Sequence, residues 1–336
     1  MLVEMTEVRC PCTERVVPPC GKLSRFRVIL VLLIMGFDAL GTVKADTNET
    51  ALQGTLIRYG EESAQIAFAT GLPSSKHLIM LGGLGSGIDF NEYCPMISNA
   101  LKPEGWAVVQ IMLSDSYIGY GVGSLTQDAD EMHMLVELLR DEFGAQTVVL
   151  LGHSTGCQDN VRYMQKYSRE TPHLAGVILQ APVSDREALV YVYNGTSALV
   201  QQAQAMVAQG RGEDILTRQW DSSGSTPVTA RRYLSFTAPG GAGDDDMFSS
   251  DLTDSQLKER LGPCGTVPTY IIFSGADENV PPSVDKLRLV TRFKQALGPL
   301  SRSTIVEGAN HELDGHAAEM TKLVEAFLAN LTSDSS

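Results

Sequence analysis

One turn constrains the fold of this chain more than any other feature. An apolar run at residues 148–151 leads into Gly152-His153-Ser154-Thr155-Gly156, and a helix-like segment follows. This Gly-x-Ser-x-Gly pattern is typical of a nucleophile elbow, a tight strand-to-helix turn whose central serine has strained backbone angles. The flanking glycines leave room for the chain to pass closely. The pattern predicts that the hydroxyl of Ser154 lies exposed at the end of a strand.

A serine hydroxyl is a useful nucleophile only when a base removes its proton, so an acid and a histidine should follow the turn. A β-branched and aromatic run at 269–273 predicts a buried strand that ends just before Asp277. A short predicted strand at 303–306 is followed by a turn and then by His311. The order Ser, Asp, His is that of α/β hydrolases. We therefore predict Ser154 as nucleophile, His311 as general base and then acid, and Asp277 as the carboxylate that orients the imidazole.

Donors for a tetrahedral oxyanion are predicted in a Gly-rich loop at 82–87, which follows an earlier predicted strand at 77–81. One donor is expected to be the backbone amide of Thr155. The other is the amide of Gly83 or of Leu84, and the sequence leaves this choice open. The same loop lacks the Gly-Lys-Ser/Thr ending of a P-loop and the acidic residue of a dinucleotide site, so phosphate binding is disfavoured.

Other residues compete for two of these roles. Asp185 and Glu187 follow the sixth predicted strand, where some hydrolases place their acid. Asp277 is favoured because Asp-x-x-Val-Pro after a strand is the more specific pattern. His316 is the alternative base, but it is expected to begin the last helix as a cap or surface residue.

The remaining histidines and cysteines are expected to be structural. We expect His153 to pack away from the substrate, and Cys157 to behave as a small buried hydrophobe. Metal-ligand spacing with cysteines or carboxylates is missing around the other three histidines, His77, His133 and His173. No metal site is therefore predicted, and no cofactor, because a triad and oxyanion amides suffice for acyl transfer.

Helical and strand patterns alternate along residues 54–330, which predicts a mostly parallel central sheet with helices on both faces. With 336 residues and 43% hydrophobic content, the chain can form one such core plus an insertion. Almost ninety residues separate the sixth predicted strand from the strand at 268–273, far more than an ordinary connection. Within a hydrolase domain at 46–336 we therefore predict a cap or lid insertion at 185–265, between the sixth and seventh main strands.

Two segments of the predicted cap differ in character. Residues 197–209 are rich in alanine and glutamine and are expected to be helical. Residues 239–248 contain several glycines and then Asp244-Asp245-Asp246. We expect a flexible loop whose aspartates are solvated or cap the N-terminus of a helix; the alternative is contact with a cationic or metal-chelating substrate.

The first 45 residues are predicted to be a signal peptide or an N-terminal anchor. Three basic residues precede an apolar run at 28–37, which is too short to span a bilayer comfortably but suits a signal-peptide core. Val43-Lys44-Ala45 is an acceptable cleavage site. Glycosylation sequons begin at Asn48, Asn194 and Asn330. We expect a glycoprotein of the secretory pathway, with membrane anchoring by the apolar run as the alternative.

Cleavage there would leave three cysteines, Cys94, Cys157 and Cys264. At most one disulfide can then form, between Cys94 and Cys264, and the sequence does not show whether it does. The formal net charge of −14 argues against nucleic acid or an anionic membrane as a partner. No stable protein partner can be inferred.

As a whole, the chain resembles a little-characterised family of α/β hydrolases that includes fungal siderophore esterases. The resemblance covers roughly residues 54–330, and its matching stretches are Gly82-Gly83-Leu84, Ser116-Tyr117-Ile118-Gly119-Tyr120-Gly121, Gly152-His153-Ser154-Thr155-Gly156-Cys157-Gln158-Asp159, Gln180-Ala181-Pro182-Val183-Ser184-Asp185-Arg186-Glu187, Asp244-Asp245-Asp246-Met247-Phe248-Ser249-Ser250-Asp251-Leu252 and Ser274-Gly275-Ala276-Asp277. It implies the α/β-hydrolase fold and makes an ester substrate plausible, including a siderophore-type ester.

We therefore predict a serine hydrolase, specifically a carboxylic ester hydrolase that forms an acyl-enzyme on a small-molecule ester. One alternative is thioesterase or peptidase chemistry on the same triad. The other is a non-catalytic binding protein on a hydrolase scaffold.

Overall fold

An eight-stranded sheet forms the centre of the molecule. The computed structural model describes residues 52–193, 197–221 and 224–333. The spatial order is β1-β2-β4-β3-β5-β6-β9-β10, and every pair from β4 to β10 is parallel, whereas β2 is antiparallel to β1 and β4. The bounds are β1 Thr55–Arg58, β2 Ile66–Thr70, β3 Lys76–Leu81, β4 Trp106–Met112, β5 Thr147–His153, β6 Leu174–Gln180, β9 Thr269–Ser274 and β10 Ser301–Val306.

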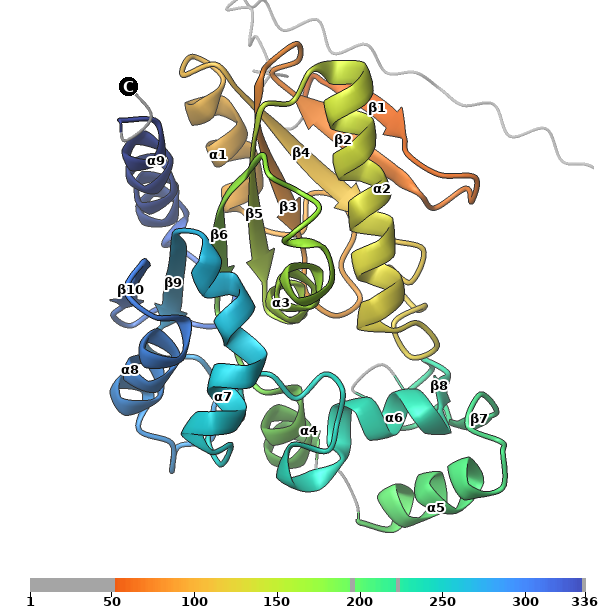
Figure 1. The fold of residues 1–336 in the computed structure, drawn as a ribbon. Coiled ribbons are helices and arrows are strands. Elements are labelled where there is room, and N and C mark those ends of the chain that lie inside the picture. Colours follow the sequence, from red (N-terminus) through yellow and green to blue (C-terminus); the bar gives the residue numbers. More distant parts are fainter. Residues whose placement is uncertain (1–51, 194–196, 222–223, 334–336) are drawn as a thin grey trace, which may run out of the picture. The chain divides into compact units, whose positions relative to one another are not determined.

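Helices cover both faces of this sheet (Figure 1). One face packs against α1 (Tyr93–Leu101) and α9 (Ala317–Ser333). The other face packs against α2 (Leu125–Phe143), α3 (Thr155–Tyr167), α7 (Asp254–Leu261) and α8 (Lys286–Leu297). Successive residues of β5 alternate between the two cores. Burial on both faces explains why the strand reads as a continuous apolar run rather than an alternating one.

A long segment is inserted between β6 and β9, as expected. Its elements are α4 (Asp185–Tyr193), α5 (Ser197–Ala208), β7 (Ile215–Thr217), β8 (Val228–Thr229), α6 (Ala230–Thr237), η1 (Pro239–Gly241), α7 and η2 (Gly262–Thr266). In Figure 1, α4, α5 and α6 lie beyond the carboxyl ends of the central strands. They form a small core of their own around Trp220, against which Leu84 and Tyr120 also pack. The proposed limits of the cap, 185–265, remain a prediction.

The expectation of solvated aspartates at 239–248 was wrong for two of the three. Asp245 is 1% exposed and pairs with Arg232, and Asp246 is 3% exposed and pairs with Arg186. A buried carboxylate is tolerated only with such partners. Only Asp244 is exposed, and it pairs with Arg162. The two buried aspartates therefore hold parts of the inserted segment together, and Asp244 joins that segment to α3 of the core.

The three cysteines in the described part of the chain are free and buried. Cys94 belongs to the core on the α1 and α9 side, whereas Cys157 and Cys264 belong to the opposite core, so the sheet separates Cys94 from Cys264, the one pair that the sequence left possible. No helix among the described residues is long and apolar enough to cross a membrane. The predicted signal peptide and the sequons at Asn48 and Asn194 lie outside the described residues, while Asn330 is exposed on α9.

Candidate active site

Ser154 lies at the sharp turn between β5 and α3, with φ 53° and ψ −121°. A Cβ atom at Gly152 would lie 2.1 Å from the carbonyl oxygen of Gly156, and a Cβ at Gly156 would lie 2.7 Å from the carbonyl oxygen of Gly82. Larger residues at these two positions would therefore clash with backbone. The positive φ of Ser154 is rare for a residue other than glycine, and such a conformation costs on the order of 1–3 kcal/mol. The packed strand and helix hold the turn in place and direct Ser154 toward the carboxyl edge of the sheet.

The structure brings the three predicted triad residues together in one hydrogen-bonded chain. Nε2 of His311 lies 2.8 Å from Oγ of Ser154, and Nδ1 of His311 lies 2.8 Å from Oδ2 of Asp277. Asp277 follows β9 and His311 follows β10, so adjacent parallel strands deliver both side chains to the same edge. The backbone amide of Asn279 donates to the second oxygen of Asp277. This geometry allows the serine proton to pass to Nε2.

The environment of His311 favours its protonated form. Burial alone would lower the pKa of this imidazole, but the hydrogen bond and negative charge of Asp277 outweigh it and raise the pKa above its usual 6.5. The Asp277 side chain is completely buried. A desolvated carboxylate beside Nδ1 fixes the tautomer that leaves Nε2 as the proton acceptor.

The predicted oxyanion donors border the same serine. A Cβ atom at Gly83 would lie 2.8 Å from Cβ of Ser154, so the glycine brings its backbone directly against the nucleophile. Thr155 is the first residue of α3, where backbone amides have no intrahelical acceptor. Both residues and Leu84 line the cavity at Ser154. The choice between the amides of Gly83 and Leu84 stays open.

This active-site cavity has a volume of about 240 Å³. Its walls come from the core loops and from the inserted segment, which contributes apolar and acidic side chains. The inserted segment and the loop before α4 supply Val183, Asp185, Ala188, Leu189 and Asp221. Tyr120 from a core loop lines the cavity and hydrogen-bonds to Asp221, so core and insertion meet across it. The lining combines apolar side chains with many polar and acidic ones, so the cavity suits a small organic ligand that carries polar groups.

The competing residues have other partners. Asp185 lines the cavity and accepts a 2.7 Å hydrogen bond from Nε2 of Gln158, while burial, with a contribution from Asp245, raises its pKa to about 7. Glu187 binds the backbone amide and hydroxyl of Ser250. His316 lies just before α9 and pairs with Glu319 on the surface, as expected.

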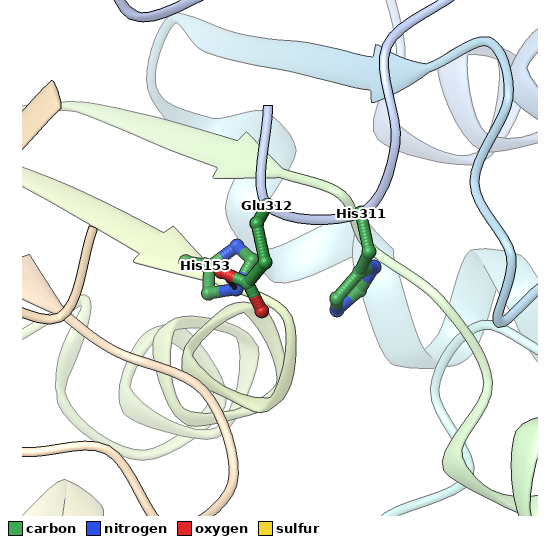
Figure 2. A group of neighbouring side chains, drawn as sticks. All are labelled: His153, His311 and Glu312. Carbon is green, nitrogen blue, oxygen red and sulfur yellow. Dashed lines mark ion pairs between the residues drawn. The ribbon is translucent and has the colours of Figure 1, made fainter. Parts of the chain in front are cut away.

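The expectation that His153 packs away from the substrate was wrong. Its ring is buried but lines the cavity, and its Nε2 lies 3.1 Å from Oε2 of Glu312. Figure 2 shows the Glu312 carboxylate between the rings of His153 and His311. Glu312 was missed because it is simply the residue after His311. No sequence pattern pairs it with a histidine more than 150 residues earlier.

Gln180, at the end of β6, forms hydrogen bonds to both His153 and the backbone of His311. Its Oε1 accepts from Tyr93 Oη at 3.1 Å and lies 2.5 Å from Nδ1 of His153. Its Nε2 donates to the carbonyl oxygen of His311 at 3.4 Å. The amide therefore holds His153 and the loop of His311 in a fixed relation.

A second cavity, of about 30 Å³, lies behind the Gly-rich loop and is lined by buried charges. Asp115, Asp128 and Asp159 surround it together with Arg232 of α6. Arg232 is 3% exposed, donates to the carbonyl oxygen of Tyr120 at 2.8 Å and pairs with Asp245. Burial raises the pKa of all three lining carboxyl groups. The inserted segment is thus connected to the core next to the oxyanion loop.

Solved structures place this architecture in a known class. The siderophore hydrolase EstB from Aspergillus fumigatus is similar, with a TM-score of 0.70 and 29% identity over 84% of this chain and 99% of that chain. The protein is an α/β hydrolase, which confirms the fold class expected from the sequence.

The family model described as "Protein of unknown function (DUF1749)" matches residues 45–332, and the chain belongs to this family. A UPF0613 protein of Schizosaccharomyces pombe is 37% identical, over 70% of this chain and 80% of its own length. The fusarinine C esterase SidJ of Aspergillus fumigatus is 31% identical, over 84% of this chain and 96% of its own length. The expected kinship with fungal siderophore esterases is confirmed.

Proposed function

We propose that this protein is an ester hydrolase that uses Ser154 as its nucleophile. The observation that carries the proposal is the chain of two 2.8 Å contacts from Asp277 through His311 to Ser154, at an elbow that faces a cavity. Relatives named as a fusarinine C esterase and a siderophore hydrolase support ester hydrolysis.

In the proposed mechanism, Nε2 of His311 accepts the Ser154 proton while Oγ attacks the ester carbonyl carbon. The amide of Thr155 and that of Gly83 or Leu84 stabilise the oxyanion. His311 then gives its proton to the departing alcohol, which leaves an acyl group on Ser154. A water molecule, deprotonated by the same imidazole, hydrolyses this acyl-enzyme. Asp277 stays ionised and stabilises the imidazolium in both steps.

The proposed substrate is a small-molecule ester whose shape the inserted segment selects. That segment forms part of the cavity wall, so its side chains would contact whichever part of the ester extends from Ser154. The named substrate of one relative makes fusarinine C a reasonable first test ester. Simple p-nitrophenyl esters serve as a comparison because p-nitrophenolate is a good leaving group whose release can be followed by its colour.

A fluorophosphonate probe on the purified protein tests the nucleophile. We expect the wild type to be labelled and to hydrolyse p-nitrophenyl esters, and we expect Ser154→Ala to lose labelling and about 10⁵-fold or more of the turnover. Ser303→Ala is the matched control, because this serine lies on β10 beside another surface groove. It should label like the wild type.

A folded wild type that neither labels nor turns over would replace this proposal by a binding protein on a hydrolase scaffold. Labelling with selective turnover of thioesters or peptides would keep the Ser154 mechanism and change the substrate class. A panel of matched ester, thioester and amide substrates separates these outcomes.

We also propose that residues 1–45 direct the chain into the secretory pathway. The support is the basic and apolar pattern of this segment together with the exposed Asn330, which begins a sequon. N-terminal sequencing of protein expressed in eukaryotic cells should find Asp46 as the first residue. Retention of the N-terminus with the protein in the membrane fraction would favour the anchor instead.

A further inference from the structure

Three metal-ligating side chains meet at the mouth of the active site, next to Ser154. One ligand atom from each of His153, His311 and Glu312 lies within 4.8 Å of the others. The three come from the end of β5 and the loop after β10, and Figure 2 shows them around one point. Both rings are buried, whereas the Glu312 side chain is 48% exposed, so the group is open to solvent on one side.

The hydrogen bonds behind the two rings determine which nitrogens face this point. Because Nε2 of Gln180 donates to the His311 carbonyl, Oε1 of Gln180 is an acceptor and Nδ1 of His153 must donate to it. Nδ1 of His311 likewise donates to Asp277. In their neutral forms, both imidazoles therefore present the lone pair of Nε2.

Two acceptors consequently face each other at short distance. Nε2 of His153 lies 3.1 Å from Oε2 of Glu312. A lone pair and a carboxylate at this distance repel each other unless a positive charge lies between them or on the ring. That charge can be a proton on His153 or a bound metal ion. A metal ion could in addition bind Nε2 of His311, in place of the hydrogen bond between this atom and the Ser154 hydroxyl.

The donor set identifies the kind of metal. Two imidazole nitrogens and one glutamate oxygen form a His₂Glu set, which binds Zn²⁺ with a water as the fourth ligand, whereas Mg²⁺ and Ca²⁺ prefer oxygen ligands. Each imidazole already has the hydrogen bond on its other nitrogen that orients metal-bound histidines in proteins. Tetrahedral ligands about 2.0–2.1 Å from Zn²⁺ lie about 3.4 Å apart, so the ligand atoms, which lie within 4.8 Å of one another, would have to approach by up to about 1.4 Å.

We propose that His153, His311 and Glu312 form an inhibitory Zn²⁺ site in which the metal occupies Nε2 of both imidazoles. Zn²⁺ at Nε2 of His311 takes the lone pair that accepts the Ser154 proton. The nucleophile then stays protonated, and removal of the metal restores it. The inhibition rests on the proposed hydrolase function, whereas the binding of the metal does not.

Calorimetry with Zn²⁺ as the probe tests binding, and the rate of fluorophosphonate labelling tests inhibition. The full chain is used with Cys10, Cys12 and Cys20 replaced by serine, because these thiols could bind zinc themselves. We expect one Zn²⁺ per chain, labelling slowed at least about 10-fold and restored by EDTA, and no effect of Mg²⁺. Glu312→Gln should weaken Zn²⁺ binding by at least about 10-fold, since it removes the charged ligand.

Two further variants make the result specific. His316→Ala removes a surface histidine that also lies 3.1 Å from a glutamate oxygen, and it should bind Zn²⁺ like the wild type. Ser154→Ala should still bind Zn²⁺ although it cannot be labelled, which separates failure of the hydrolase proposal from failure of the metal site. Zinc affinity that is unchanged in Glu312→Gln, or lost in His316→Ala, would overturn the site. Absence of Zn²⁺ binding to the wild type would likewise overturn it.

Discussion

At the scale of single residues, the protonation of His311 decides when the nucleophile can act. Asp277 raises the pKa of this imidazole above 6.5, although burial opposes the shift. A general base must be neutral to accept a proton, so activity is lost as the pH falls through this raised value. Asp185 is a second titrating group in the same cavity, with a pKa of about 7, but it does not share a hydrogen bond with His311 in the described structure.

The acid limb of the pH profile tests the link between Asp277 and His311. We expect kcat/KM for a neutral p-nitrophenyl ester to rise with pH through a value above 6.5 and then to level off. In Asp277→Asn this limb should move to lower pH, because the charge that stabilises the imidazolium is gone. Values of kcat/KM measured in steps from pH 5 to pH 9 locate the acid limb. If the substitution does not move the limb, a group other than His311 is responsible for it.

The identity of the triad acid can be tested by parallel substitutions. Asp277→Asn should lower kcat by about 10⁴-fold, because the amide favours the wrong imidazole tautomer. Asp185→Asn should cost far less, because its carboxyl group bonds to Gln158. Steady-state kinetics on both variants compares them directly, and a larger loss in Asp185→Asn would reverse the assignment.

At the scale of elements, α6 is attached to the core through one buried arginine. Arg232 pairs with Asp245, donates to the Tyr120 carbonyl and lies over the ring of Phe236 at 4.2 Å. Its removal would leave Asp245 as a buried carboxylate without its partner, among other buried carboxyl groups. Burial of this kind is costly, so the pair determines whether the inserted segment stays in place.

We expect Arg232→Met to lower the free energy of unfolding by about 3–5 kcal/mol. The neighbouring Arg231→Met is the control, since its pair with Glu213 is exposed and should contribute less than about 1 kcal/mol. Urea denaturation followed by circular dichroism measures both. Equal losses in the two variants would contradict the role of the buried pair.

At the scale of the whole molecule, buried carboxyl groups make the stability of the fold depend on pH. Burial raises the pKa of Asp115, Asp128 and Asp159, and it raises that of Asp185 to about 7. Between the unfolded pKa, about 4, and these raised values, the folded state binds more protons than the unfolded state. Stability from these groups is therefore present at low pH and is lost as the pH rises through the folded pKa values.

Thermal unfolding should consequently occur at a higher temperature near pH 5.5 than near pH 8. Asp185→Asn should reduce the part of this difference that lies between pH 5.5 and pH 7, because the amide does not titrate. Differential scanning calorimetry across this range measures the effect. A melting temperature that rises steadily from pH 5.5 to pH 8 would show that other groups dominate.

Sequence patterns predicted the scaffold well because local rules govern it. The β-branched and apolar runs identify the central strands to within a few residues, and the glycines around Ser154 identify the turn. The cavity wall was not predictable in the same way. His153 and Glu312, or Arg232 and Asp159, meet only after the sheet has formed, and no short-range periodicity records such pairs.

The packing of Leu84 and Tyr120 against the small core of the inserted segment has a consequence for engineering. Leu84 belongs to the loop that is expected to supply an oxyanion donor, so the segment proposed to select the substrate also supports the loop proposed to accelerate its reaction. Exchanging the inserted segment alone between relatives would therefore not transfer substrate specificity. A chimera would need the Gly-rich loop and the Tyr120 loop of the same parent to keep its turnover rate.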